Sequence, residues 1–360
     1  MRTLISHRWA PAVLVAVVAL AACGGDSTDT TATASATTAA STQEIVIEGG
    51  TGLFGECLRS AFYDPFTEET GITVLEAAED SGMARVQLAV ETGNYEVDVE
   101  QLDSASQLEE FGEELLEPID YSRVPGDEMI VAPTYGVPVN PNGFVVGYNE
   151  EFLPGGALPE GIEDFFDLEK FPGKRALFEF SSAHWIALAL LADGVAPDEI
   201  VPFDFDRAFT KLDTIKDELV YASSGTDMRA LLDAGETPLQ ITFASRIKES
   251  LDAGIPAGAG WDGFSLFANF LAIPKGNPNA DVAMDLIAFI SRSDISGGMS
   301  GCVGVGPANA EAGVDAAAEP YLPTSHLDER YVNLSSSDAV AWMTGNEDEI
   351  FNRWQEWRTR

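Results

Sequence analysis

Several loops that follow predicted strands combine Ser, Thr, Asn or Gly with an aromatic neighbour, a mixture suited to hydrogen bonding and stacking against a small polar molecule. These loops cover residues 51–56, 80–82, 103–104, 140–144, 181–185, 245–246 and 267–269. Each one alone is ordinary turn chemistry. However, α/β sheets bind ligands in the loops at the carboxyl ends of their strands. The repetition along the chain therefore predicts a cleft assembled from two α/β lobes.

Arg246, His184 and Trp185 in these loops, and Trp261 in a separate loop, carry more specific chemistry. Arg246 could hold a ligand carboxylate through a bidentate guanidinium fork, or form an ion pair with one of the many acids of the chain. His184 and Trp185 lie at the start of a predicted helix. They could line the cleft, or they could serve only to cap the helix and pack in the core. Trp261 lies in a glycine-rich loop, where an aromatic side chain is harder to explain as core, and we expect it in the cleft.

A hydrolase is a poor match to these residues. The three histidines are His7, His184 and His326, and no GxSxG motif is present. A pairing of Ser181 with His184 is possible, but nearness in sequence is weak evidence for a catalytic triad. The eight tyrosines are dispersed, which argues against a ferric-ion site, and no Cys/His cluster suggests a metal. We expect no enzyme activity, no cofactor and no metal.

The charge balance excludes nucleic acid as a partner. The chain has 59 acidic and 20 basic residues, a formal net charge of −39. Phosphate binding needs a basic patch, which this composition does not provide. The acidic residues are scattered along the chain. A role in solubility or adaptation to salt therefore explains the negative charge more simply than electrostatic steering of a cationic ligand.

The amino terminus predicts export. Residues 1–22 have the basic start, the short apolar run and the small residues of a secretory signal. They end directly before Cys23, an arrangement that resembles the lipobox of bacterial lipoproteins and implies a diacylated Cys23 as the new amino terminus. Residues 23–43, rich in Ser, Thr and Ala, would form a flexible tether. We therefore expect an extracytoplasmic protein that is lipid-anchored to the bacterial cell membrane.

Two further cysteines remain, Cys57 and Cys302. In an exported protein, an isolated pair near glycine-rich turns favours a disulfide bond. Two buried free thiols are the alternative.

The elements that must position these residues alternate between strands and helices. Hydrophobic periodicity predicts strands at 44–48, 72–76, 97–101, 176–179, 239–243 and 267–273. It predicts helices at 55–70, 83–92, 107–111, 183–193, 205–216, 280–291 and 337–357. Such alternation implies a largely parallel sheet with crossover helices.

The order and spacing of several segments make this chain similar to the spermidine/putrescine-binding protein family, the extracellular solute-binding lipoproteins of ABC importers. The segments are FTEETGITV at 66–74, VPVNPNGFVVGYN at 137–149, FFDLEKFPGKRAL at 165–177, LLDAGETPLQITFASR at 231–246, LAIPKGNPNADVAMDLIAFISR at 271–292 and VGPANAEA at 305–312. The resemblance covers about residues 44–360. It implies an α/β, two-lobed periplasmic-binding-protein fold of type II-like architecture, with the ligand cleft between lobes that two crossings join.

The resemblance also implies the lobe boundaries and a partner. One lobe would comprise residues 44–140 plus 271–322, and the other residues 141–270 plus 323–360. Both Cys57 and Cys302 would belong to the first of these lobes. The protein would act as a monomer that delivers its ligand to a cognate ABC permease.

Departures from the family pattern leave the ligand open between two chemistries. Polyamine binders are expected to use carboxylates and an aromatic box, yet the expected acids fall on Ser181, His184 and Asn269. A small nitrogen-containing solute of polyamine type is the first expectation, and a zwitterion such as γ-aminobutyrate (GABA) is the alternative. The expected ligand-binding residues are Thr51, Phe54, Glu56, Ser81, Asp103, Ser104, Ser181, His184, Trp185, Ser245, Arg246, Trp261, Phe267 and Asn269.

Overall fold

The computed structural model describes residues 43–50, 52–78, 82–102 and 104–360. Several predictions concern positions outside these ranges: the signal at 1–22, the anchor at Cys23, the tether up to residue 42, and the ligand-site candidates Thr51, Ser81 and Asp103. Within the described ranges, no helix combines the length and the apolar character that a bilayer crossing needs.

The amino-terminal part follows the predicted alternation closely. It contains β1 (Glu44–Glu48), α1 (Gly52–Leu58), a π-helical turn (Arg59–Tyr63), α2 (Asp64–Thr70), β2 (Thr73–Ala77), α3 (Met83–Thr92), β3 (Glu100–Leu102) and α4 (Ala105–Leu115). Gly71 ends α2 in the left-handed conformation, with φ of 76°. Ser104 is the N-cap of α4 and accepts a hydrogen bond from the backbone N–H of Gln107.

The middle of the chain contains two strands much longer than the others. Its elements are β4 (Val137–Asn149), α5 (Ile162–Phe166), β5 (Arg175–Phe178), α6 (Ser182–Ala192), α7 (Phe205–Asp213), β6 (Leu219–Ala222), α8 (Gly225–Asp233), β7 (Leu239–Phe243), α9 (Ala244–Asp252) and β8 (Ala257–Ala272). The remainder contains α10 (Ala280–Ile290), α11 (Ser300–Val303), β9 (Tyr331–Asn333), α12 (Ser337–Met343) and α13 (Glu347–Thr359).

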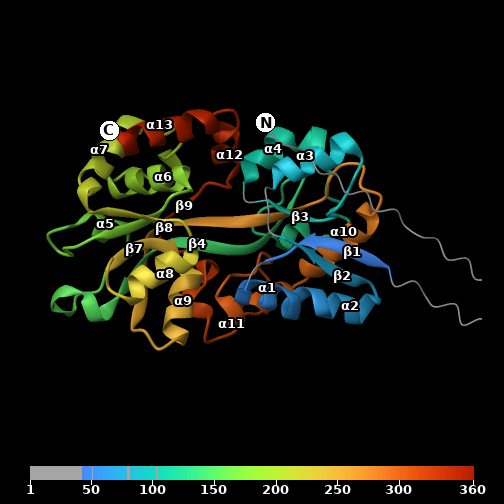
Figure 1. The fold of residues 1–360 in the computed structure, drawn as a ribbon, viewed down its shortest axis with the longest axis horizontal. Helices are drawn as coiled ribbons and strands as arrows, with labels where there is room; N and C mark the ends of the chain where they lie inside the picture. Colours follow the sequence, from blue (N-terminus) through green and yellow to red (C-terminus); the bar gives the residue numbers. More distant parts are fainter. Residues whose placement is uncertain (1–42, 51, 79–81, 103) are drawn as a thin grey trace, which may run out of the picture. The chain divides into compact units, whose positions relative to one another are not determined.

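The main sheet is mixed, which corrects the prediction of a largely parallel sheet. Its strand order is β3-β8-β4-β7-β5-β6, with β9 also paired to β8. β5 pairs in parallel with β6 and β7, whereas β8 is antiparallel to β3 and β4, and β4 is antiparallel to β7. The physical reason is that β4 and β8 run side by side in opposite directions through the body (Figure 1). Antiparallel pairing of two long strands differs from the strand–helix–strand crossover that joins parallel strands, which is what the alternation of strands and helices suggests.

The apolar side chains pack into separate cores that β4 and β8 connect. One cluster, which we call the first core, draws its residues from 45–139 and 271–308. Another, which we call the second core, draws its residues from 144–241 and 332–357. Val137 and Val139 of β4 belong to the first core, while Phe144 and Val146 of the same strand belong to the second. These two α/β bodies are the lobes of a two-lobed binding-protein fold.

Two further predictions of elements are corrected. The helix expected at 337–357 is two helices, α12 and α13, because Gly345 adopts a left-handed φ of 79° between them. The strand expected at 267–273 is the second half of β8, whose first half is rich in glycine and reads as a loop.

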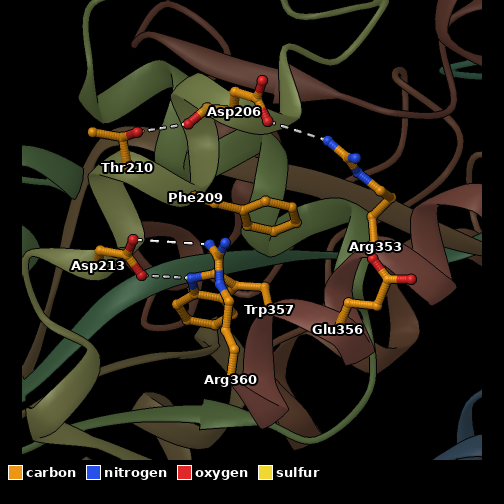
Figure 2. A pocket seen from close by; sticks show the side chains of 8 residues that line it. All are labelled: Asp206, Phe209, Thr210, Asp213, Arg353, Glu356, Trp357 and Arg360. Carbon is orange, nitrogen blue, oxygen red and sulfur yellow. Dashed lines mark hydrogen bonds and ion pairs between the residues drawn. The ribbon is translucent and has the colours of Figure 1, made fainter.

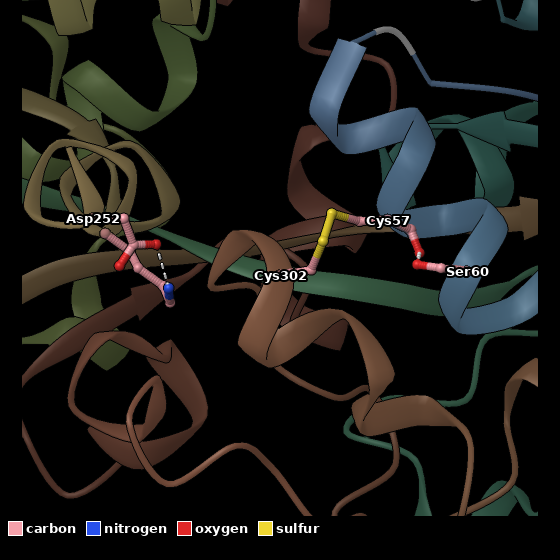
Figure 3. The surroundings of a disulfide bond; sticks show 5 residues. Cys57, Ser60, Asp252 and Cys302 are labelled. Atoms are coloured by element: carbon pink, nitrogen blue, oxygen red, sulfur yellow. Dashed lines mark hydrogen bonds and ion pairs between the residues drawn. A yellow bond between two sulfur atoms is a disulfide. The ribbon is translucent and has the colours of Figure 1, made fainter.

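A disulfide bond joins Cys57 of α1 to Cys302 of α11, with Cα atoms 6.0 Å apart (Figure 3). Cys57 is fully buried in the first core, and Val303, next to Cys302, belongs to the same core. The bond therefore ties the amino-terminal helix to a segment 245 residues later in the chain.

Candidate ligand-binding cleft

A cavity of about 920 Å³ lies where the two cores meet. Its described lining consists of Glu48, Phe54, Gly82, Met83, Ala84, Gln101, Leu102, Gln107, Asn140, Asn142, Phe144, Phe180, Ser181, His184, Ser223, Ser224, Gly225, Thr226, Phe243, Ser245, Arg246, Phe267, Asn269 and Val305. This volume is in the range of small-molecule sites.

The structure brings half of the predicted ligand-binding residues together at this cavity. They are Phe54, Ser181, His184, Ser245, Arg246, Phe267 and Asn269. Four other candidates lie outside the described lining. Glu56 is exposed on α1, and Ser104 caps α4. Trp185 is 1 % exposed in the second core, where its Nε1 donates to the Phe180 carbonyl at 2.7 Å. Trp261 is buried and stacks on His326, with ring centroids 4.0 Å apart.

First turns of helices converge on the cavity. The lining includes residues from the amino-terminal ends of α1, α3, α4, α6, α8 and α9. The first backbone N–H groups of a helix have no partner within the helix, and the helix dipole places partial positive charge at this end. Such a convergence of helix amino termini favours a negatively charged ligand group. Two of these helices, α8 and α9, were not among the helices predicted from the sequence.

Arg246 adds to the same wall a guanidinium group that is paired with one carboxylate. The residue lies in the first turn of α9, and its Nη1 pairs with Glu249 at 2.5 Å. Its Nε is buried and has no hydrogen-bond partner among the described residues. The guanidinium packs against Gly225 at the start of α8, where a β-carbon would be 2.5 Å from Nε. A guanidinium and a helix terminus side by side form a suitable site for a carboxylate.

The second core supplies an aromatic wall. Phe144 is at its centre, with ring-centroid distances of 4.8 Å to Phe267, 4.9 Å to Phe243 and 4.8 Å to His184. Phe180 also lines the cavity and is 46 % exposed. These rings offer an apolar surface for methylene groups and electron-rich faces for a cation.

His184 is a neutral member of this wall. Part of its surface remains open, yet the surrounding rings remove most of its hydration, and burial lowers its pKa to about 4. Its Nδ1 hydrogen-bonds with the Ser265 hydroxyl at 2.7 Å, so the side chain faces β8 rather than Ser181. This arrangement gives no support to the pairing of Ser181 with His184 that was considered from the sequence.

Carboxylates contribute little to the described lining, where Glu48 is the one acidic residue. Glu48 forms an ion pair with Arg85 at 3.0 Å, and Arg85 also binds Glu100 at 2.5 Å. Burial is the main reason that the pKa of Glu100 is raised. The described part of the cavity therefore has no carboxylate cage of the kind expected for a polyamine.

Gln101 and the segment 223–226 line the cavity but were not named from the sequence as ligand contacts. Asn140 and Asn142 also line it; they belong to the predicted cleft loop 140–144 but were not among the expected ligand-binding residues. One signal could have revealed the segment 223–226. Ser224 caps α8 by accepting a hydrogen bond from the Asp227 backbone N–H, and the run SSGTD is a recognisable helix start.

A second pocket, of about 360 Å³, lies between α7 and the end of α13, and two ion pairs form between its own residues. Figure 2 shows Arg353 directed toward Asp206, and Trp357 and Arg360 directed toward Asp213. The Trp357 Nε1 donates to Asp213 at 2.7 Å. No group of three or more potential metal ligands occurs anywhere in the described ranges.

Two cores joined by long antiparallel strands, with a polar and aromatic cavity between them, define a two-lobed solute-binding protein. Comparison with known proteins gives the family. The model for bacterial extracellular solute-binding proteins matches residues 61–324. The chain therefore belongs to the bacterial extracellular solute-binding protein family.

Individual relatives agree with this assignment. A GABA-binding protein of Pseudomonas aeruginosa is 28 % identical over 334 residues, which cover 89 % of this chain and 92 % of that protein. A spermidine/putrescine-binding periplasmic protein of Salmonella typhimurium is 23 % identical over 248 residues, covering 65 % of this chain and 69 % of that protein.

Solved structures are similar over nearly the whole described chain. A GABA receptor aligns with a TM-score of 0.80 and 29 % identity, covering 88 % of this chain and 98 % of that one. A periplasmic binding protein of Agrobacterium tumefaciens in complex with agropinic acid aligns with a TM-score of 0.71 and 27 % identity, covering 88 % and 99 %.

Proposed function

We propose that this protein is the solute-binding component of an ABC importer and that it captures a small zwitterionic amino acid, with GABA as the leading candidate. The ligand binds in the cavity between the two lobes and is delivered to the permease without chemical change. The lobes are residues 44–140 plus 271–322 and residues 141–270 plus 323–360.

The observation that carries the zwitterion assignment is the position of Arg246 against the first turn of α8. A carboxylate there receives charge-assisted hydrogen bonds from the guanidinium and from backbone N–H groups. A polyamine has no anionic group, so the same wall repels it. The ligand named for two of the relatives, GABA, has the required carboxylate.

The opposite end of such a ligand finds neutral partners. The rings of Phe144, Phe243 and Phe267 accommodate methylene groups, and their faces attract an ammonium group. Amide oxygens of the lining asparagines can accept its hydrogen bonds. This combination suits one ammonium group better than the two or more of a polyamine, because desolvating each extra charge requires a compensating partner.

Capture requires the ligand to contact both lobes. The cavity lining includes Phe54 and Gln101 on the side of the first core, and Ser181 and Arg246 on the side of the second. A ligand shifts a two-lobed protein toward its closed form only through contacts that the closed form alone provides. Occupancy is then signalled to the permease by closure.

Calorimetry with GABA, putrescine and spermidine tests the proposal. Wild-type protein should bind GABA, and Arg246→Ala should lose several kcal/mol of binding free energy, as when one partner of a desolvated charge pair is removed. Arg229→Ala is the matched control, because Arg229 also pairs with Glu249 but does not line the cavity. If the wild type preferred a polyamine and Arg246→Ala left that binding unchanged or tighter, the zwitterion assignment would be wrong.

A further inference from the structure

Asn140 of β4 has a backbone conformation that side chains rarely adopt. Its φ is 52°, and in the described chain the only other non-glycine residue with a positive φ is Ser181, at 65°. Both residues line the cavity. Left-handed backbone at non-glycine residues persists where the surrounding structure imposes it, and it concentrates at ligand-binding sites.

A β-bulge imposes this conformation on Asn140. Val139 pairs with Asn269, and Asn142 pairs with Phe267, so Asn140 and Pro141 together face the single residue between those partners on β8. The Pro141 carbonyl accepts a hydrogen bond of 2.8 Å from the Gly306 N–H, which fixes the bulge to the first core. An extra residue of this kind redirects a side chain out of the normal alternation of the strand.

The Asn140 amide is buried without an internal partner. The residue is 5 % exposed, and neither Oδ1 nor Nδ2 has a hydrogen-bond partner among the described residues. Its neighbour Asn142 lines the same cavity but is satisfied, since Nδ2 donates to the Ser245 hydroxyl at 2.9 Å and Oδ1 accepts from the Gly143 N–H at 2.8 Å. Buried polar groups are normally hydrogen-bonded, so the contrast points to a partner from outside the chain.

We infer that Asn140 is a specificity-determining residue of the cleft: the bulge between the two cores presents its amide to the ligand, and Oδ1 accepts a hydrogen bond from the ligand's ammonium group. This inference rests on the proposed function and deepens it. It assigns a neutral acceptor to the cationic end of a zwitterion, where a polyamine would require a carboxylate.

Asn140→Gly is the informative variant, because glycine adopts a positive φ without strain and removes the whole side chain, including the amide. We expect its affinity for GABA to fall at least tenfold, while the unfolding midpoint of the ligand-free protein stays unchanged or rises. Asn149→Ala is the matched control on the same strand. Asn149 is 1 % exposed, and its amide donates to the Leu232 carbonyl and accepts from the Glu151 N–H. Its loss should lower the midpoint and leave the affinity unchanged.

Asn140→Asp tests the specificity itself. Aspartate tolerates the left-handed conformation and replaces a neutral acceptor with a charged one. The ratio of putrescine affinity to GABA affinity should rise at least tenfold relative to the wild type.

The inference is overturned if Asn140→Gly binds GABA as tightly as the wild type, or if its ligand-free midpoint falls as far as that of Asn149→Ala. If the wild type binds neither GABA nor putrescine, the proposed ligand class is wrong. The unfolding midpoint of ligand-free Asn140→Gly then decides whether the Asn140 amide is reserved for a ligand. An unchanged or higher midpoint then supports an amide reserved for a ligand, and a lower midpoint overturns it.

Discussion

The guanidinium of Arg246 packs directly on the backbone of Gly225, so that a β-carbon added to Gly225 would lie 2.5 Å from Nε and 3.0 Å from Nη2. Gly225 is the first residue of α8, and its backbone has no positive φ that would itself require glycine. The absence of a side chain is therefore needed for the position of the arginine rather than for the conformation of the helix.

Gly225→Ala should weaken ligand binding without unfolding the protein. The added methyl group must push the guanidinium away from the start of α8, and we expect roughly a tenfold loss of GABA affinity, about 1.4 kcal/mol. Gly313→Ala is the control, because a β-carbon there meets no atom within 4 Å. Equal affinity of the two variants in calorimetry would contradict the role assigned to this contact.

His184 should make the protein less stable in acid. Burial lowers its pKa from 6.5 to about 4 in the folded state, so the unfolded chain binds the proton more readily. Its contribution to stability is complete above pH 6.5 and is lost as the pH falls toward 4, by up to about 3 kcal/mol. Urea unfolding at pH 7 and pH 4.5 measures the difference.

His184→Gln, which cannot be protonated in this range, should flatten that part of the pH dependence. If His184→Gln and wild-type protein lost stability equally between these pH values, another group would be responsible.

The disulfide between Cys57 and Cys302 should contribute strongly to stability. It closes a loop across a sequence separation of 245 residues, and a loop of this length corresponds to about 5.5 kcal/mol in the chain-entropy model. Reduction, or the Cys57→Ser and Cys302→Ser double variant, should lower the unfolding midpoint by several degrees. Peptide mapping under non-reducing conditions should recover the two cysteines in one linked peptide pair, and recovery of both as free thiols would refute the bond.

Anchoring through Cys23 is a separate prediction, because this residue lies outside the described ranges. Cys23→Ala should release the protein from membranes or block its processing, since two acyl chains on this cysteine are the proposed attachment. Binding of GABA by the body should be unchanged. Detergent partitioning identical to that of the wild type would exclude the lipid anchor.

Local signals allowed much of the amino-terminal half to be predicted from sequence. The strand at 44–48 and the helix at 83–92 agree with the structure residue for residue. Alternation and helical periodicity are local properties, and each of these segments follows one of them clearly. The residue types at helix ends are local signals as well: Gly71 ends α2 in the left-handed conformation, and Ser104 caps α4.

The cavity was only partly predictable because its geometry depends on pairings between distant segments. Asn140 reads as part of a Pro/Asn/Gly turn, yet the register between β4 and β8 makes it a bulge in a continuous strand. Trp261 reads as a loop aromatic, yet β8 begins before it and places it against His326. In both cases the deciding information lies in a partner more than 60 residues away, which periodicity does not contain.

The composition of the two cores also determines the order in which they can form. The first core needs apolar residues from 45–139 and from 271–308, so its amino-terminal half has no complete partner until most of the chain has been synthesised. The second core is completed only by Trp354 and Trp357, near the last residue. Contacts of such large sequence separation fold slowly, because the loop must close before the contact stabilises it. A nascent chain of this protein therefore exposes apolar surface of the first core until residues 271–308 have been made, and apolar surface of the second core until Trp354 and Trp357 have been made.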